Sequence, residues 1–189
     1  MRKIILSEFI SLDGVMEAPG PDGSSFEYAG WTFPFWCEEI GKYKYDELFV
    51  ADALLLGRVT YEGFAKAWPT MQSAGDFGER MNNIQKFVIS TSLAKADWNN
   101  TNIIKENVTE EIKKLKEMPG NDLLIAGSGE LANFLLKEGL IEEIRLLVYP
   151  IILGKGKRLF KDGTNQKLKL LSTREFSTGV AALHYEMAK

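Results

Sequence analysis

Short apolar runs alternate along most of this chain with stretches whose apolar residues recur every three or four positions. Short runs are typical of buried strands, and periodic stretches are typical of amphipathic helices. Strands are predicted at 4–10, 53–56, 86–89, 103–104, 123–126 and 142–149, with a last pair at 167–176 and 180–187. Helices are predicted at 35–49, 58–67, 78–84, 107–118 and 130–136.

This alternation predicts an α/β fold. Strands that are separated by helices run parallel, and nearly all-apolar strands fit a sheet that is covered on both faces. Only Ser177, Thr178 and Gly179 separate the last two strands, which must therefore be antiparallel. We expect three layers, with a mostly parallel central sheet, helices on both faces and an antiparallel C-terminal hairpin. No linker or repeat divides the chain, so a single domain over 1–189 is predicted.

The strand at 123–126 runs through a glycine turn into a helix. Gly127 and Gly129 end the strand, and Glu130 and Leu131 begin the helix. Free N–H groups and the helix dipole make such a turn an anion site. Gly127, Gly129 and Ala132 fit the G-x-G-x-x-G/A pattern, but no acidic residue follows about 20 positions later, as a conventional dinucleotide fold requires. The alternative is a tight turn that binds nothing.

Two other strand ends carry groups that suit phosphate. Gly57, Arg58 and Thr60 follow one strand, and the hydroxyl cluster Ser90, Thr91 and Ser92 follows another. Thr60 could instead be a plain helix cap. Together with Ser128 in the glycine turn, these groups predict an NADPH site. Arg58 and the hydroxyl groups would bind the 2′-phosphate, and the glycine turn would bind the pyrophosphate.

Two carboxylates lie at or near the carboxyl end of the first strand, where ligands of open α/β sheets bind. Asp13 and Glu8 are therefore candidate catalytic residues. Asp13 could instead form a turn with Gly14, and Glu8 could be solvent-exposed on one strand face.

Aromatic residues crowd the segment 26–36. Trp31 and Trp36 are candidates for a lid that stacks on a flat ligand, although the loop could also pack on its own core or across a dimer interface.

The start of the helix at 107–118 has its own sequence motif. Asn107 is followed by Glu110 three residues later, and this spacing predicts a capping box.

Composition and charge exclude several classes of function. The net charge of −3 gives no electrostatic footprint for nucleic acid. The single cysteine, Cys37, excludes an internal disulfide, and its apolar neighbourhood predicts a buried, inert thiol. The single histidine, His184, leaves no histidine-rich metal cluster and reads as a satisfied or exposed strand residue. Neither a signal peptide nor a membrane span is found, so a cytoplasmic protein is expected.

The combined motifs resemble the dihydrofolate reductase superfold. They are closer still to the reductase domain of bacterial riboflavin biosynthesis and its stand-alone relatives. The resemblance rests, in family order, on Ser11-Leu12-Asp13-Gly14, Leu56-Gly57-Arg58-Val59-Thr60-Tyr61, Ile89-Ser90-Thr91-Ser92, Ala126-Gly127-Ser128-Gly129 and Tyr149-Pro150-Ile151-Ile152-Leu153-Gly154-Lys155-Gly156. It implies NADPH, hydride transfer and a homodimer. With one histidine and one cysteine, the zinc deaminase half of the riboflavin enzyme is absent here.

The resemblance also implies a substrate carboxylate in the first helix, for which Glu38 and Glu39 are candidates, and Asp13 is another. The predicted substrate-binding residues are Trp31, Trp36, Glu39 and Gly154. The leading hypothesis is an NADPH-dependent reductase of a pterin- or pyrimidine-like heterocycle, or of a related imine or carbonyl compound. It would be similar to 5-amino-6-(5-phosphoribosylamino)uracil reductase. The alternatives are a nucleotide- or drug-binding protein that has lost turnover, and a purely structural domain.

Overall fold

The computed structural model describes residues 1–20 and 25–188, and within these residues eight strands form one sheet in the order β4-β3-β2-β5-β1-β6-β8-β7. The strands are β1 (Ile4–Ser11), β2 (Ala53–Gly57), β3 (Gln85–Ile89), β4 (Thr101–Ile104), β5 (Leu123–Ala126), β6 (Glu143–Tyr149), β7 (Leu168–Glu175) and β8 (Ala181–Met187). Strands β1 to β6 run parallel, and β8 is antiparallel to both β6 and β7. The mostly parallel sheet and the C-terminal hairpin are therefore confirmed.

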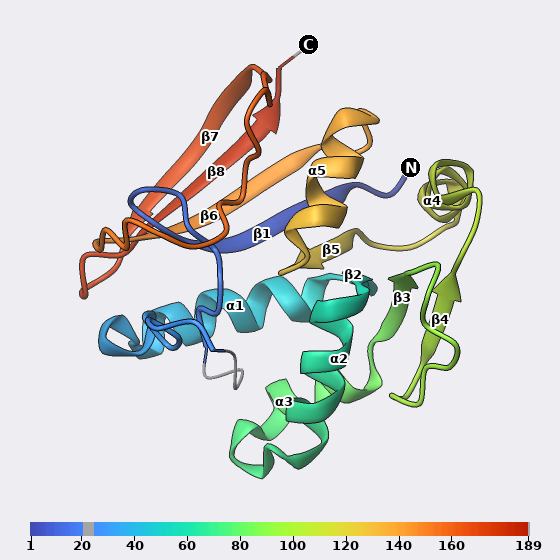
Figure 1. Cartoon of the computed structure of the whole chain (residues 1–189), viewed down its shortest axis with the longest axis horizontal. Coiled ribbons are helices and arrows are strands. Elements are labelled where there is room, and N and C mark those ends of the chain that lie inside the picture. The colour runs from blue at the N-terminus through green and yellow to red at the C-terminus, as the bar shows by residue number, and fades with distance from the viewer. Residues whose placement is uncertain (21–24, 189) are drawn as a thin grey trace.

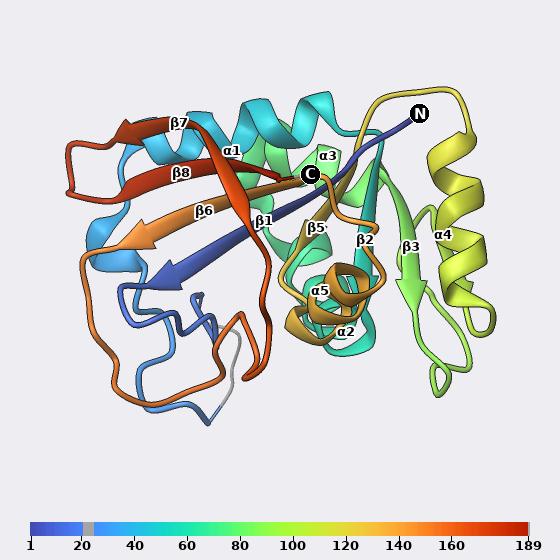
Figure 2. The same ribbon diagram turned by 90° about the horizontal axis from the view of Figure 1, so that it is seen from above.

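Helices cover both faces of the sheet. They are α1 (Glu38–Val50), α2 (Arg58–Ala67), α3 (Gly75–Asn83), α4 (Val108–Glu117) and α5 (Gly129–Lys137), with short 3-10 turns at Phe33–Phe35, Trp68–Thr70 and Gln72–Ala74. Figure 1 shows α4 and α5 on one side of the strands and α1, α2 and α3 on the other. Figure 2 shows the same arrangement from above, with the β7–β8 hairpin at one end of the sheet and β3 near α4 at the other. The predicted three layers are thus present.

The central strands are buried because nearly every side chain that they carry is apolar. Leu54, Leu55 and Leu56 of β2 are all fully buried, and alternate side chains enter the cores on opposite faces. A fully buried side chain of this size contributes about 1.5–3 kcal/mol. Strand β7 differs, since almost all of its residues are exposed, including Leu170 and Leu171.

Local differences from the sequence predictions have local causes. The helix expected at 35–49 begins at Glu38, because Phe33–Phe35 form a 3-10 turn that contains Pro34 and Trp36 is extended. The capping box expected at Asn107 is wrong. This residue adopts a left-handed φ of 50° and makes no side-chain capping hydrogen bond. Among the described residues, no helix has the length and apolar character needed to cross a bilayer.

Candidate active site

Three strand–helix junctions meet at one edge of the sheet. Strands β3, β2 and β5 are neighbours and run parallel, so their carboxyl ends lie together. The turns after β2 and β5 are joined directly, because the N–H of Gly57 donates to Ser128 Oγ at 2.9 Å. The convergence of junctions that the sequence predicted is present in the structure.

The turn between β5 and α5 requires its first glycine. Gly127 has a φ of 65°, and a Cβ atom there would lie 2.8 Å from Thr60 Cγ2. Ser128 is also left-handed, and its carbonyl accepts the N–H of Ala132 at 2.9 Å. No hydrogen bond among the described residues occupies the N–H groups of the first three residues of α5, Gly129 to Leu131. These N–H groups can bind an anion.

Part of the space at this turn is filled by side chains of the protein. Thr60 packs against Gly127, and a Cβ atom on Gly129 would lie 2.7 Å from Met16 Sδ. Met16 is a flexible side chain from the loop after β1 and can move. This contact could not be predicted from the sequence, because it joins two turns that are more than 100 residues apart.

The other predicted cofactor residues lie around the same edge. Arg58 is exposed and pairs with Glu62 at 2.8 Å. Ser90 Oγ accepts the N–H groups of Ser92 and Leu93 at 3.2 and 3.0 Å, so this hydroxyl is engaged in a local turn. Thr91 and Ser92 are exposed.

Glu130 and Leu131 follow the glycine turn in the first turn of α5. Glu130 is exposed and pairs with Lys161 at 2.5 Å, whereas the side chain of Leu131 is buried in the core. Leu131 can therefore offer a ligand only its backbone N–H.

Glu8 is buried in the sheet rather than exposed, which corrects the alternative reading that left it on a solvent face. It is 5% exposed, and its Oε1 atom has no hydrogen-bond partner among the described residues. The pairing of Ser7 with Ala126 places Glu8 beside the Gly127 turn. Burial raises the pKa of Glu8 well above its ordinary value, although Lys44 and the N–H of Gly127 oppose this shift. The carboxyl group therefore holds its proton to higher pH than an ordinary glutamate does, and it can serve as a proton donor.

Asp13 has the opposite environment. Its Oδ1 accepts Ser11 Oγ at 2.6 Å and the N–H of Leu153 at 3.1 Å, and its Oδ2 accepts the N–H of Gly154 at 2.9 Å. The hydrogen bond from Ser11 is the largest cause that lowers the pKa of Asp13 to about 2. Asp13 is therefore ionised near neutral pH and joins the loops after β1 and β6. These contacts bring together two predicted site residues, Asp13 and Gly154.

The aromatic segment divides between the core and the surface. Trp31 is buried, donates its Nε1–H to the carbonyl of Glu17 at 2.8 Å and packs edge-on against Tyr149. Trp36 is 52% exposed and covers Gly41. Glu39 accepts the N–H of Ser177 at 3.2 Å, which ties the start of α1 to the β7–β8 turn.

Cys37 is half-buried rather than buried, which corrects the sequence prediction. The adjacent Trp36 is turned outward, so the aromatic neighbourhood in the sequence does not enclose the sulfur. Among residues 1–20 and 25–188, no group of three acidic, histidine or cysteine side chains is placed to hold a metal ion.

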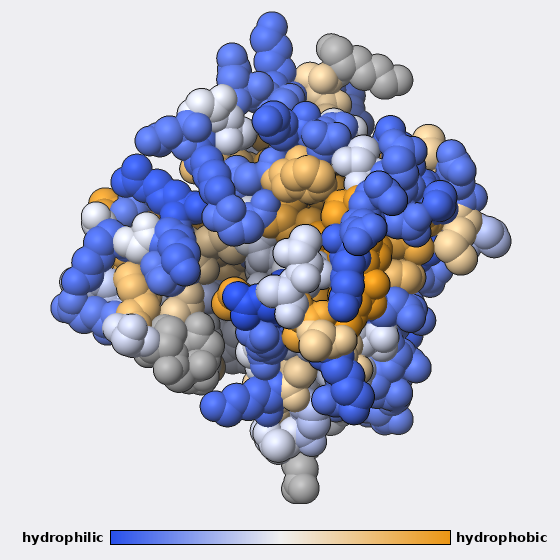
Figure 3. Space-filling view, turned by 45° about the vertical axis from the view of Figure 1, so that its right-hand side comes forward, coloured by the Kyte–Doolittle hydropathy of each residue, from blue (hydrophilic) through white to orange (hydrophobic). Residues whose placement is uncertain are grey.

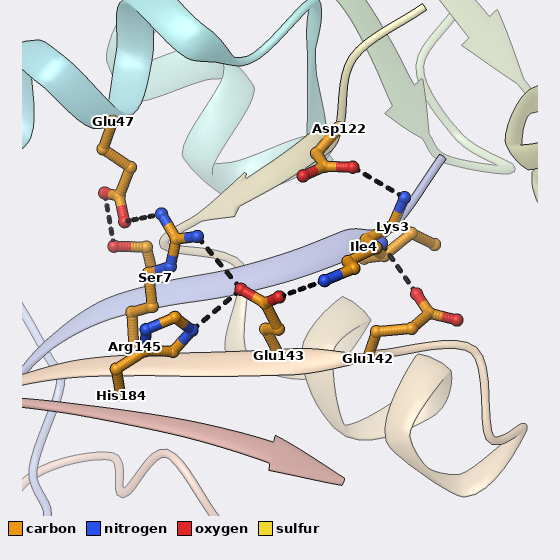
Figure 4. Close-up of polar contacts among 9 residues, drawn as sticks. All are labelled: Lys3, Ile4, Ser7, Glu47, Asp122, Glu142, Glu143, Arg145 and His184. Carbon is orange, nitrogen blue, oxygen red and sulfur yellow. Dashed lines mark hydrogen bonds and ion pairs between the residues drawn. The ribbon is translucent and has the colours of Figure 1, made fainter. Parts of the chain in front are cut away.

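A second charged cluster lies on the α1 side of the sheet, and the sequence analysis missed it (Figure 4). Glu143 accepts Lys3 Nζ at 2.6 Å and Arg145 Nη2 at 3.0 Å, and pairs with His184 Nε2 at 2.8 Å. Glu47 pairs with Arg145 at 3.4 Å. His184 is thus satisfied, as expected. Glu143 and Arg145 are two residues apart on one strand, so their side chains share a face, and this spacing could have indicated an ion pair. Their other partners come from distant segments and could not be predicted in this way.

This cluster predicts a pH-dependent contribution to stability. Burial opposes ionisation of Glu143, but Lys3, Arg145 and His184 lower its pKa to about 2. The stabilisation is present above the ordinary glutamate pKa and is lost as the pH falls toward 2. We expect Glu143→Gln to lower the free energy of unfolding by about 2 kcal/mol at pH 7, after allowance for solvent screening. Denaturant unfolding at several pH values measures this difference, which should shrink in acid.

Glu186→Gln is the matched control for this prediction. Glu186 lies opposite Glu143 on β8, and its side chain is 41% exposed and forms an ion pair with Lys169. We expect it to change stability little. A loss in Glu143→Gln that stays constant down to acid pH would contradict the electrostatic explanation.

A hollow of about 410 Å³ lies at the opposite edge of the sheet, near the first residues of β2 and β3. Its charged members are paired with other groups of the protein: Arg2 Nε donates to the carbonyl of Asn121 at 2.5 Å, and Asp52 accepts the N–H of Asn121 at 2.6 Å. Figure 3 turns the β3, β4 and α4 side forward and shows apolar surface among charged side chains. The hollow offers few free polar groups to orient a ligand, so the converging junctions remain the better site.

Comparison with known proteins gives the family. The model of the RibD C-terminal domain matches residues 2–182. Uncharacterized protein YyaP of Bacillus subtilis (strain 168) is 31% identical over 97% of this chain and 94% of its own.

Solved structures show the same fold. The deaminase/5-amino-6-(5-phosphoribosylamino)uracil reductase of Thermotoga maritima has a TM-score of 0.66 and 13% identity over 99% of this chain and 57% of that one. Dihydrofolate reductase of Enterococcus faecalis, complexed with NADP(H), has a TM-score of 0.64 and 13% identity over 99% and 97% of the two chains. At these identities the likeness concerns the fold alone.

Proposed function

The chain belongs to the RibD C-terminal domain family, and we propose that it is an NADPH-dependent reductase. The observation that carries this proposal is the convergence of the β2, β3 and β5 junctions at one edge of the sheet, where none of the described residues accepts a hydrogen bond from the first N–H groups of α5. These N–H groups suit a pyrophosphate, and the exposed Arg58 suits a 2′-phosphate. The residues present therefore fit a phosphorylated dinucleotide.

When bound, NADPH would supply the hydride, and the protein would supply position and charge. Met16 would have to move off Gly129 so that the N–H groups of α5 could hold the pyrophosphate. Arg58 would exchange its exposed pair with Glu62 for the second phosphate. Glu8 lies one residue beyond the strand position that pairs with β5, and it donates a proton to the group that receives the hydride, directly or through one water molecule.

The substrate in this proposal is a small, flat heterocycle of the pterin or pyrimidine type, or a related imine or carbonyl compound. The Thermotoga maritima protein of the same fold is named for reduction of such a uracil, which supports this class. Exposed Trp36 and Glu39 offer a stacking surface and a carboxylate near the start of α1, whereas Trp31 is buried. The loop held by Asp13 at Gly154 closes the end of the site.

We further propose that residues 1–189 act as one domain and form a homodimer in the cytoplasm. Strand β7 supports the dimer, because it is an edge strand whose Leu170 and Leu171 are 49% and 43% exposed. The proposed reductase acts on a small molecule and uses neither nucleic acid nor a membrane. The net charge of −3 is consistent with that choice.

One observation favours a second candidate, a nucleotide- or drug-binding protein without turnover. Met16 and Thr60 fill part of the space around the glycine turn, and this filling would hinder a cofactor from taking a reactive position.

Incubation with NADPH and a panel of aminouracils, pterins and cyclic imines separates these two functions. We expect at least one compound to be reduced, with loss of the absorbance of the reduced nicotinamide and one reduced product formed for each NADPH consumed. Tight binding of NADPH without oxidation across the panel would favour the binding protein. Absence of any NADPH binding would reject the reductase and would leave only the drug-binding form of the second candidate.

A further inference from the structure

A fully buried lysine, Lys86, lies near the start of β3 and has no part in the chemistry described above. Its Nζ atom donates to three backbone carbonyl oxygens, those of Ile84 at 2.8 Å and of Asn82 and Asn99 at 3.0 Å. The same atom lies 4.1 Å from the centroid of the Trp98 ring. Burial is the largest cause that lowers the pKa of Lys86 to about 8, so the amine is still mostly charged at neutral pH.

A buried ammonium group is costly because it gives up its hydration, so its contacts need an explanation. Asn82 and Ile84 lie at the end of α3, whereas Asn99 lies in the β3–β4 loop, which comprises residues 90–100. The ammonium group of Lys86 therefore ties the far end of this loop to the end of α3. The near end of the same loop carries the hydroxyl groups of 90–92.

The far end of the β3–β4 loop is also tied to α2, through Tyr61. The hydroxyl oxygen of Tyr61 accepts the N–H of Trp98 at 3.1 Å, and the centroids of the two rings are 6.1 Å apart. Tyr61 is 4% exposed and lies in the first turn of α2. Leu93, at the near end of the loop, packs against the apolar cluster that contains both rings. One hydrogen bond thus joins the helix that begins at Arg58 to this loop.

The distance between α2 and the β3–β4 loop bears on the choice of cofactor. NADPH differs from NADH by its 2′-phosphate, and the groups that suit this phosphate come from both segments: Arg58 from the start of α2, and the hydroxyl groups of 90–92 from the loop. A charged group and hydroxyl groups bind one phosphate together only when they are held at a fixed separation. The contacts of Tyr61 and Lys86 with the far end of the loop set that separation.

We propose that Tyr61 and Lys86 are positioning residues that hold the β3–β4 loop against α2 and thereby set the preference of the site for NADPH over NADH. This inference rests on the proposed function, because it concerns the 2′-phosphate of the same cofactor. Both side chains are buried and act through the loop, Tyr61 through Trp98 and Lys86 through Asn99. The pyrophosphate, which NADPH and NADH share, is bound at α5 and does not depend on them.

Isothermal titration of the full-length protein with NADPH and with NADH measures the ratio of the two affinities. Tyr61→Phe keeps the ring and removes the acceptor for the N–H of Trp98, so it should weaken NADPH binding about fivefold and leave NADH binding unchanged. Lys86→Met should lower the ratio in the same direction. Tyr45→Phe, on a tyrosine that stacks on Phe49 in α1, is the matched control and should leave the ratio unchanged.

Amide hydrogen exchange without cofactor tests the loop itself. The N–H of Trp98 should exchange faster in Tyr61→Phe than in the wild type, because its acceptor is gone. Equal weakening of NADPH and NADH binding in Tyr61→Phe would show a purely structural role, and that result or a wild-type ratio would overturn the proposal. A wild-type protein that binds no NADPH is a different result, since it would reject the proposed function and this inference with it.

Discussion

Replacement of Glu8 by glutamine is expected to lower turnover by about 10²- to 10⁴-fold while NADPH affinity stays close to that of the wild type. Glutamine has the same shape, but it cannot supply the proton that the buried carboxyl holds. The pKa of Glu8 is raised because the side chain is buried with one unpartnered oxygen. Steady-state and single-turnover kinetics with a substrate from the panel measure the effect.

The pH dependence of turnover tests whether Glu8 acts as a proton donor. A proton donor acts in its protonated form, so the wild-type rate should fall as the pH rises through the raised pKa of Glu8. Glu8→Gln should lose this limb of the profile. Asp13→Asn is the matched control, because Asp13 is ionised above about pH 2 and binds loop N–H groups. It should lower stability and keep the limb. If Asp13→Asn abolished the limb and Glu8→Gln kept it, the assignment of the donor would be wrong.

Replacement of Gly129 by aspartate is expected to weaken NADPH binding by about 100-fold. The new carboxylate would lie at the start of α5, where it would compete with the pyrophosphate for the free N–H groups and repel its charge. Gly129 lies outside the left-handed region, so the backbone accepts a side chain, and Met16 must shift. Isothermal titration of both proteins with NADPH measures the change.

Two controls make this result specific. Gly129→Asn has nearly the same size without the charge and should lose far less affinity than Gly129→Asp. An aspartate in the first turn of a helix also favours the helix dipole, so the free energy of unfolding of Gly129→Asp should not fall through helix loss. Wild-type affinity in Gly129→Asp would reject the proposed phosphate site.

Local chemistry explains why much of the fold could be predicted from the sequence. Unbroken short apolar runs such as Leu54 to Leu56 are most stable in a strand that is buried on both faces of the sheet. Parallel strands then bring their carboxyl ends to one edge, so the meeting of the turns at Gly57 and Gly127 follows from the order of elements. The contact between Gly57 and Ser128 is a consequence of that geometry.

The environments of some charged residues could not be predicted from the sequence, because they depend on which strands become neighbours in the sheet. Glu8 is buried, with no hydrogen-bond partner for its Oε1 atom among the described residues, because β1 lies between β5 and β6. Alternation along β1 alone does not specify those neighbours. The same holds for Glu143, whose partners Lys3 and His184 come from the two ends of the chain. Asn107 failed as a cap for a local reason, since its backbone adopted the left-handed region.

The central claim is that the joined turns after β2 and β5 bind a phosphorylated nicotinamide dinucleotide. Amide NMR of the labelled protein during titration with NADPH tests it most directly, since it requires no knowledge of the substrate. We expect saturable shifts concentrated at 57–60 and 127–131. No shift at these amides, or shifts confined to the hollow at the opposite edge around Arg2 and Gln85, would contradict the account.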